Sequence, residues 1–332
     1  MSEKLACFGE LLLRLTTPGN ERFGQSGQLD VHFGGAEANV AVSLARFGHD
    51  VTMISAVADN PLGASIVNGL RGEGVKTETI QKGEGRMGLY FLETGAVLRP
   101  SRIVYDRADS VFASSSEDIY DWAKLLEGVS LVHMSGITPA TGPGPAEAAK
   151  RLAKYCTEHE LELSFDGNYR EALWKSWSGD GPAILRELLS AATIAFINER
   201  DIALLLGTEP EERSAAITRA FKAFPRLKQI ACTRRGQSSV SNQSLVGELY
   251  DRDGCTISRD YALEGVVDRI GGGDAFAAGV LHCLRAQKSA DYTIEFATAA
   301  SAIKHSIPGD FNLSSISEVE DAMKDGGLDV RR

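Results

Sequence analysis

Apolar runs of strand length alternate with amphipathic segments of helix length along most of the chain. Short apolar runs predict strands at 4–15, 50–56, 75–79, 131–135, 161–166, 194–197, 229–233, 238–240 and 245–250, and periodic segments predict helices at 36–47, 60–72, 117–126, 145–159, 274–287 and 292–305. This alternation predicts an α/β fold with a mostly parallel sheet between helices. Glu10 and Arg14 interrupt the first run, so we expect a buried strand to continue there into an exposed edge strand.

Two short alternating runs, at 86–93 and 102–106, break this rhythm. They predict a small antiparallel sheet that stands apart from the main sheet as a lid. We therefore expect residues 1–332 to form one domain, in which a lid is formed by about 11–33 and 86–113. Such a sheet exposes one face and its edges, so we expect lids to pair between subunits of a homodimer or higher homo-oligomer.

Composition and charge narrow the class of protein. The 332 residues are 43% hydrophobic and 24% charged, as in globular proteins, and a net charge of -10 disfavours binding to nucleic acids or acidic membranes. Five cysteines without a CxxC pair predict reduced thiols in a cytoplasmic protein. The pattern predicts no signal peptide or transmembrane span, and the six histidines show no metal-ligand spacing.

Three consecutive glycines, Gly271, Gly272 and Gly273, run into Asp274 and a helix rich in small residues. Their N–H groups can turn toward one point beside a helix N-terminus, so this turn predicts a phosphate cradle. A carboxylate there is repelled by the phosphate unless it accepts a proton from an attacking hydroxyl, so Asp274 indicates phosphoryl transfer. Taken alone, these residues fit a helix N-terminus capped by Asp274 equally well.

A second glycine turn, Gly34 and Gly35, opens the helix that carries Asn39. It fits either an ordinary turn between strand and helix or a close backbone approach to a small polar ligand that Asn39 reaches. Acids and amides also follow two predicted strands, at 166–170 and 198–201, where open α/β sheets bind ligands. A dinucleotide-binding oxidoreductase is poorly supported, because no GxGxxG follows the first strand.

Both glycine turns, in their strand–turn–helix contexts, resemble the two signatures of the pfkB (ribokinase-like) carbohydrate kinases, and the likeness covers nearly all of the chain. It implies a three-layer α/β/α domain with a β lid. Segments 8–15, 99–100, 104–107, 165–170 and 308–310 are most similar to the 2-keto-3-deoxygluconate kinases of that family. This resemblance, with the first glycine turn, places at the sugar-acid site Gly34, Gly35, Asn39, Tyr90, Tyr105, Arg107, Arg170 and Asp310.

The same resemblance makes Asp274 and the amides of the glycine cradle the reaction centre. The chemistry of Arg107 and Arg170 agrees with a sugar acid, because a guanidinium fork suits a carboxylate. The alternative for each arginine is an ordinary surface ion pair, and for Tyr90 and Tyr105 it is packing within the lid.

ATP and Mg²⁺ are the cofactors that the resemblance implies, and it leaves a monovalent cation such as K⁺ open. Residues on the nucleotide side are Asn198, Thr233, Gly236 and Thr298, of which the last three are equally compatible with a plain role in the fold. Two positions depart from the family pattern. Arg269 stands where threonine is common, and Asp201 replaces the glutamate of an Asn-x-x-Glu motif, so its shorter side chain predicts contact with Mg²⁺ through water.

The predicted function is ATP-dependent phosphorylation of 2-keto-3-deoxygluconate at its 6-hydroxyl, with Asp274 as the base. Other sugar acids, such as ketogluconate and 2-keto-3-deoxygalactonate, and neutral sugars such as fructose stay open as substrates. A catalytically idle sensor of sugar acids or nucleotides on the same scaffold is the alternative from another class, because a fold alone does not establish activity.

Overall fold

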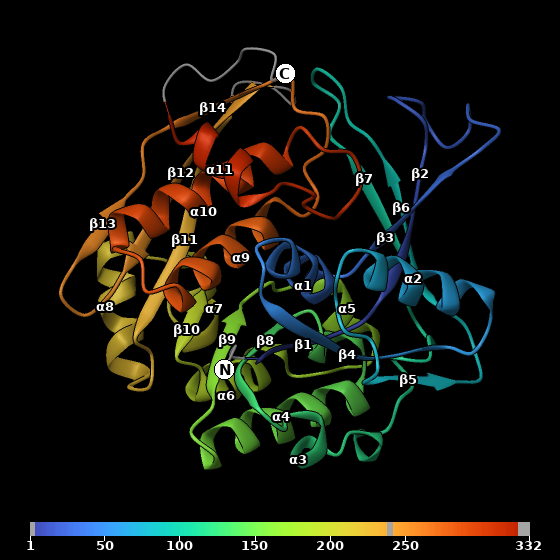
Figure 1. Ribbon diagram of the computed structural model, residues 1–332, viewed down its shortest axis with the longest axis horizontal. Coiled ribbons are helices and arrows are strands. Elements are labelled where there is room, and N and C mark those ends of the chain that lie inside the picture. The colour runs from blue at the N-terminus through green and yellow to red at the C-terminus, as the bar shows by residue number, and fades with distance from the viewer. Residues whose placement is uncertain (1–3, 238–241, 325–332) are drawn as a thin grey trace.

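A large, mostly parallel sheet forms the centre of the computed structural model, which describes residues 4–237 and 242–324 (Figure 1). Its ten strands are β1 (Lys4–Phe8), β4 (Asp50–Ala58), β5 (Ile80–Gly83), β8 (Val129–Ser135), β9 (Glu162–Asp166), β10 (Ile194–Phe196), β11 (Gln229–Gln237), β12 (Asn242–Tyr250), β13 (Cys255–Ile257) and β14 (Tyr261–Glu264). The order is β13-β12-β11-β10-β9-β8-β1-β4-β5, with β14 also paired to β12. Pairs from β11 to β5 are parallel, and the β12 edge is antiparallel.

Helices cover both faces of this sheet (Figure 1). They are α1 (Ala36–Arg46), α2 (Pro61–Gly72), α3 (Trp122–Leu125), α4 (Pro143–Glu158), α5 (Glu171–Ser176), α6 (Gly181–Ala191), α7 (Glu199–Leu206), α8 (Arg213–Ala223), α9 (Gly272–Arg285), α10 (Ala290–Lys304) and α11 (Ile316–Ala322). Strand β1 shows why two layers form. Leu5 and Cys7 join the core under α1, α2, α9 and α10, whereas Ala6 and Phe8 join the core under α3 to α8.

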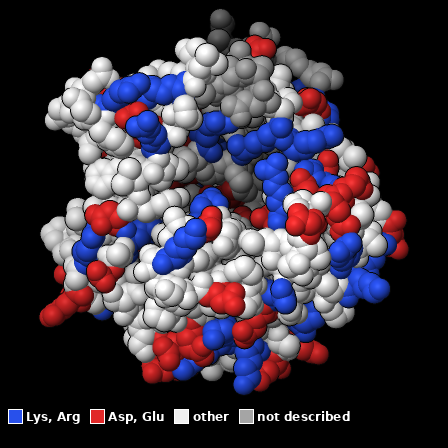
Figure 2. Space-filling model, turned by 180° about the vertical axis from the view of Figure 1, so that it is seen from behind, with Lys and Arg blue, Asp and Glu red and all other residues white. Residues whose placement is uncertain are grey.

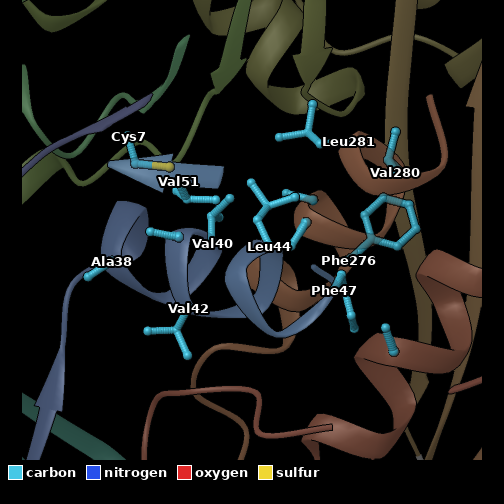
Figure 3. Close-up of a cluster of buried hydrophobic side chains, with 14 of the residues drawn as sticks. Cys7, Ala38, Val40, Val42, Leu44, Phe47, Val51, Phe276, Val280 and Leu281 are labelled. Atoms are coloured by element: carbon cyan, nitrogen blue, oxygen red, sulfur yellow. The ribbon is translucent and has the colours of Figure 1, made fainter. Parts of the chain in front are cut away.

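Packing between α1 and α9 matters most for the site. Val40 and Leu44 of α1 and Phe276 and Val280 of α9 belong to one buried cluster (Figure 3). Burying a side chain of this size stabilises the fold by roughly 1.5–3 kcal/mol. This packing holds the two helices in a fixed relative position. Asn39 on α1 and Asp274 on α9, both predicted site residues, are therefore held in place with them.

A second sheet, here called the lid sheet, stands beside the main one (Figure 1). Its strands are β2 (Leu12–Thr16), β3 (Asp30–Gly34), β6 (Gly88–Glu93) and β7 (Arg102–Asp106), in the order β3-β2-β6-β7. The two outer pairs are antiparallel, as expected, whereas the central β2–β6 pair is parallel. Together the two sheets and the helix layers confirm the ribokinase-like α/β/α fold with a separate lid sheet.

Two local predictions differ from the structure, and a third cannot be compared with it. The strand predicted at 75–79 lies instead at β5, because Lys76 forms only an isolated bridge with Thr52 and a turn from Thr77 follows. The helix predicted at 117–126 is a 3₁₀ turn, Glu117–Ile119, followed by the short α3. The strand predicted at 238–240 lies outside the described residues.

The exposed edge predicted from Glu10 and Arg14 is wrong. Both side chains are only 2% exposed, between the lid sheet and the body of the molecule. Each is buried with a partner of opposite charge, Glu10 with Arg107 and Arg14 with two aspartates. Burial of a charge requires such pairing, so the polar interruption indicates an ion-pair network and not a solvent-facing edge.

Candidate active site

Two adjoining cavities open at the carboxyl ends of the parallel strands. The first has a volume of about 360 Å³, and it lies between the lid sheet, the start of α1 and the start of α9. The second, of about 250 Å³, lies over the ends of β9, β10 and β11. Asp166, Asn168, Arg170 and Gly273 line both cavities, so ligands bound in the two would meet at these residues.

The glycine cradle forms the N-terminus of α9. Gly271 has φ +80°, and a Cβ there would collide with the Asp310 carbonyl, so this position requires glycine. Gly273 faces open space, and the amides of the first helical turn have no partners within the helix. The turn therefore presents N–H groups and positive helix potential to the first cavity.

Asp274, in the first turn of α9, accepts a hydrogen bond from Asn39 Nδ2 at 2.7 Å. Burial raises the pKa of Asp274 to about 7, the Asn39 bond opposes that rise, and the nearby charges of Asp310 and Glu37 add to it. Asn39 Oδ1 is buried without a hydrogen-bond partner in the described structure, so it is available to a ligand hydroxyl. A carboxylate with a pKa near neutrality suits general-base chemistry.

Arg107 lines the first cavity from the end of the lid sheet and is 4% exposed. Its Nε donates to Glu10 at 2.7 Å, and Ser110 Oγ donates to the same carboxylate. Arg107 Nη1 is buried and has no hydrogen-bond partner within the described part of the chain. One guanidinium edge is thus fixed by Glu10, and the other keeps a donor for an anion in the cavity.

Asp310 is held by two neighbours from the lid sheet. Its carboxylate accepts from Arg14 Nη1 at 3.1 Å and from the Tyr90 hydroxyl at 2.6 Å, and Arg14 Nη2 pairs with Asp268 at 2.7 Å. Burial raises the pKa of Asp310, whereas Arg14 and Tyr90 lower it. Tyr90 and Tyr105 lie beside each other on the cavity side of the lid sheet, which leaves them able to pack against a sugar.

The second cavity contains a helix N-terminus and two further acids. Asn198 and Asp201 form a capping box at α7, where the Asn198 N–H donates to Asp201 Oδ2 at 2.9 Å. Burial raises the pKa of Asp201, and it raises that of Asp166 to about 8, helped by the charges of Asp274 and Asp201. Among the described residues, no group of three His, Cys, Asp or Glu could hold a metal ion. A Mg²⁺ ion here would take most of its ligands from phosphates and water.

A comparison with known protein families identifies the family of this chain. The model of the pfkB family carbohydrate kinases matches residues 2–314. The chain belongs to this family. Within the described residues, no helix is both long enough and apolar enough to span a membrane.

Three relatives of this pfkB kinase carry the names of sugar-acid kinases. A 2-dehydro-3-deoxygalactonokinase from Haloferax volcanii is 28% identical over 100% of both chains. A 2-dehydro-3-deoxygluconokinase from Thermoproteus tenax is 28% identical over 96% of this chain and 94% of its own. The crystal structure of a 2-dehydro-3-deoxygluconokinase from Thermotoga maritima is 34% identical, with a TM-score of 0.91 over 96% of this chain and 99% of that one.

Most residues predicted for the site of the pfkB kinase do line the cavities. The first is lined by Gly35, Asn39, Tyr90, Tyr105, Arg107, Arg170, Gly271, Gly273, Asp274 and Asp310, and the second by Asn198, Asp201 and Thr233. Gly34 and Gly272 are not among the lining residues of either cavity. Gly236 and Thr298 line neither cavity, and the Thr298 hydroxyl bonds within α10 to the Ile294 carbonyl. The roles of these predicted residues stay predictions.

Several residues of the site had no predicted role. Glu10 and Arg14 hold the predicted Arg107 and Asp310, and Asp166 and Arg235 line the first cavity. A signal existed for Asp166, which ends a strand within a segment expected to bind ligands. For Glu10, the available signal was a charge inside an apolar run, which indicates a buried partner as readily as an edge.

Proposed function

We propose that this pfkB kinase transfers the γ-phosphate of ATP to the 6-hydroxyl of 2-keto-3-deoxygluconate. The observation that carries this proposal is the presence of two features in one cavity, the Asp274 carboxylate and Arg107 Nη1, which has no hydrogen-bond partner among the described residues. A sugar with a hydroxyl at one end and a carboxylate at the other satisfies both. The names of the relatives support the same substrate class.

In the proposed reaction, Asp274 accepts the proton of the sugar 6-hydroxyl while the oxygen of that hydroxyl attacks the γ-phosphorus. The bond from that phosphorus to the bridging oxygen breaks, and ADP leaves with the electron pair. The amides at Gly272, Gly273 and Asp274 donate to the phosphoryl oxygens. Mg²⁺ bound with the nucleotide would neutralise phosphate charge, and Asp201 would hold one of its waters. Behind Gly271, Arg14 pairs with Asp268 and Asp310, and the Lys304 ammonium donates to the Ile307 carbonyl; a requirement for a monovalent cation such as K⁺ stays open.

A coupled ADP-release assay with a panel of sugars tests the function. The panel contains the 2-keto-3-deoxy acids derived from gluconate and galactonate, ketogluconate, fructose and ribose. We expect the highest kcat/KM with a 2-keto-3-deoxy acid. A higher value with a neutral sugar would refute the sugar-acid assignment, and ligand binding without ADP release would indicate a sensor.

Arg107 and Arg170 are expected to set the KM for the sugar acid. Arg170→Ala and Arg107→Lys should raise that KM about tenfold or more, since a hydrogen bond to a charged group contributes about 1.5–3 kcal/mol, while the KM for ATP changes less. Lysine at 107 keeps a cation beside Glu10 but loses the second guanidinium edge. Arg102→Ala, an exposed lid-sheet arginine outside the first cavity, is the matched control. Equal effects on both KM values would contradict a carboxylate clamp.

We also propose that the enzyme is a homo-oligomer in which lid sheets pair. Direct strand register places Val31, Leu15, Phe91 and Val104 in one row across the lid sheet, on the face opposite Tyr90 and Tyr105. Val31 is 58% exposed and Val104 is 54% exposed. An apolar row of this kind, on a sheet with open edges, fits the same row of a second copy.

Val104→Asp should therefore shift the protein to monomer in sedimentation velocity, because a carboxylate would be buried in the pairing. Ile257→Asp places the same charge on a similarly exposed apolar residue of β13 and should leave the assembly intact. A wild-type protein that sediments as a monomer at assay concentrations would refute the proposal.

A further inference from the structure

Two arginines outside the predicted sugar-acid site face the first cavity. Arg235 lies on β11, two residues beyond Thr233 on the same side of the strand, and Arg269 lies on the loop that leads into the glycine cradle. Both line the cavity together with Gly271, Gly273 and Asp274. The face of the molecule in Figure 2 is hollowed near its centre, and Lys and Arg side chains border the hollow.

The charges of these two arginines are close enough to affect each other. Partial burial in the cavity wall lowers the pKa of Arg235, and the positive charge of Arg269 lowers it further. The described residues give Arg235 no hydrogen bond or ion pair, in contrast to Arg14 and Arg107, whose carboxylate partners are internal. Two cations that repel each other at a cavity wall are stabilised by an anion placed between them.

We propose that Arg235 and Arg269 form a clamp for the terminal phosphate of the nucleotide while it is transferred. This inference rests on the proposed phosphoryl transfer and adds to it a binding site for a doubly charged phosphate. Arg269 stands two residues before Gly271, and both residues line the first cavity. Guanidinium groups suit phosphate because they donate two parallel hydrogen bonds.

The two arginines of the clamp also offset negative charge in the first cavity. Asp166 and Asp274 face the place where the phosphate must arrive, and both repel it when ionised. Residue 269 is commonly threonine in this family, so arginine adds one positive charge beside the cradle. The sugar carboxylate does not need this pair, because Arg107 Nη1, which the described part of the chain leaves without a partner, offers a donor on the lid side of the cavity.

The test compares Arg269→Thr and Arg235→Gln with Arg234→Gln in the full-length protein. Arg234 is adjacent on β11, and its side chain points the other way, to Glu248 at 3.7 Å. Calorimetry measures the affinities for the Mg²⁺ complex of a non-hydrolysable β,γ-methylene ATP analogue and for AMP. Each clamp variant should bind the analogue about ten- to hundredfold more weakly, or show a kcat lowered by that factor, with AMP affinity and sugar KM nearly unchanged. Arg234→Gln should match the wild type.

Wild-type affinity for the analogue together with wild-type kcat in both variants would overturn the clamp. A rise in sugar KM alone would overturn it too, because the arginines would then hold the substrate carboxylate. Thermal denaturation of each variant separates loss of binding from loss of folding, and Arg235→Lys, which keeps the charge, should recover part of the affinity. Since the binding measurements contain no sugar, failure of every sugar acid as a substrate would refute the proposed function and leave the clamp standing.

Discussion

Replacing Asp274 with asparagine is expected to lower kcat by about two or more decades, with sugar and nucleotide affinities changed by a few fold at most. The amide keeps the size of the side chain but cannot take the proton of the attacking hydroxyl, and loss of a general base costs about 10²- to 10⁴-fold. Steady-state kinetics with the best substrate of the panel measures kcat, and calorimetry measures the affinities. Near-normal turnover would remove Asp274 from its proposed role.

The pH profile provides an independent control on the same residue. Since burial raises the pKa of Asp274 to about 7, its carboxylate is ionised above that pH and protonated below it. The wild-type kcat/KM should therefore fall as the pH drops below about 7, roughly tenfold per pH unit. Asp274→Asn should lose this limb, because no proton remains to titrate at that position. A wild-type profile that stays flat from pH 5 to 8 would contradict a base with this pKa.

The fold could be predicted from the sequence because its main signal is local. Each parallel strand is buried on both faces and reads as a short apolar run, while the helices between them read as longer periodic segments. The lid sheet was also visible, as two alternating runs. Its central parallel pair was not, since the pairing of β2 with β6 depends on how residues far apart in sequence meet.

The site was predictable where the backbone itself carries the chemistry. The cradle at Gly271 needs a positive φ and a close approach to the Asp310 backbone, and only glycine allows both. The glycine in the sequence therefore indicates the backbone conformation. The sequence gives no comparable indication of which charged side chains form ion pairs. Glu10 lies 97 residues from Arg107, and Arg14 lies 296 residues from Asp310, so neither pair could be inferred from spacing.

Arg14 carries the second large expected effect, this time on stability. Its guanidinium lies between Asp268 at 2.7 Å and Asp310 at 3.1 Å, and all three side chains are at most 6% exposed. Arg14→Met keeps much of the length and apolar packing but leaves two buried acids without their cation. Removing one partner from a buried ion pair costs about 3–5 kcal/mol, so we expect a loss of that size in the free energy of unfolding from urea denaturation.

The pH dependence of that loss identifies its electrostatic cause. Arg14 lowers the pKa of Asp310, which burial alone raises, so its removal should move that pKa further above the unfolded value. A group with a raised folded pKa favours folding most at low pH and loses that contribution as the pH rises through the folded pKa. The deficit of Arg14→Met should therefore be largest near neutral pH and shrink toward about pH 4, where unfolded carboxyls titrate.

Arg46→Met is the matched control for this stability measurement, since the Arg46–Glu73 pair is similar in length at 2.8 Å but its side chains are 34% and 27% exposed. Surface pairs contribute about 0–1 kcal/mol, so this variant should unfold nearly as the wild type does at every pH. A similar small loss for Arg14→Met, or a deficit independent of pH, would mean that the buried acids do not depend on Arg14. Asp310 also accepts a hydrogen bond from the Tyr90 hydroxyl, and both residues line the first cavity. If Asp310 depends on Arg14, the Arg14→Met variant should therefore also show a higher KM for the sugar.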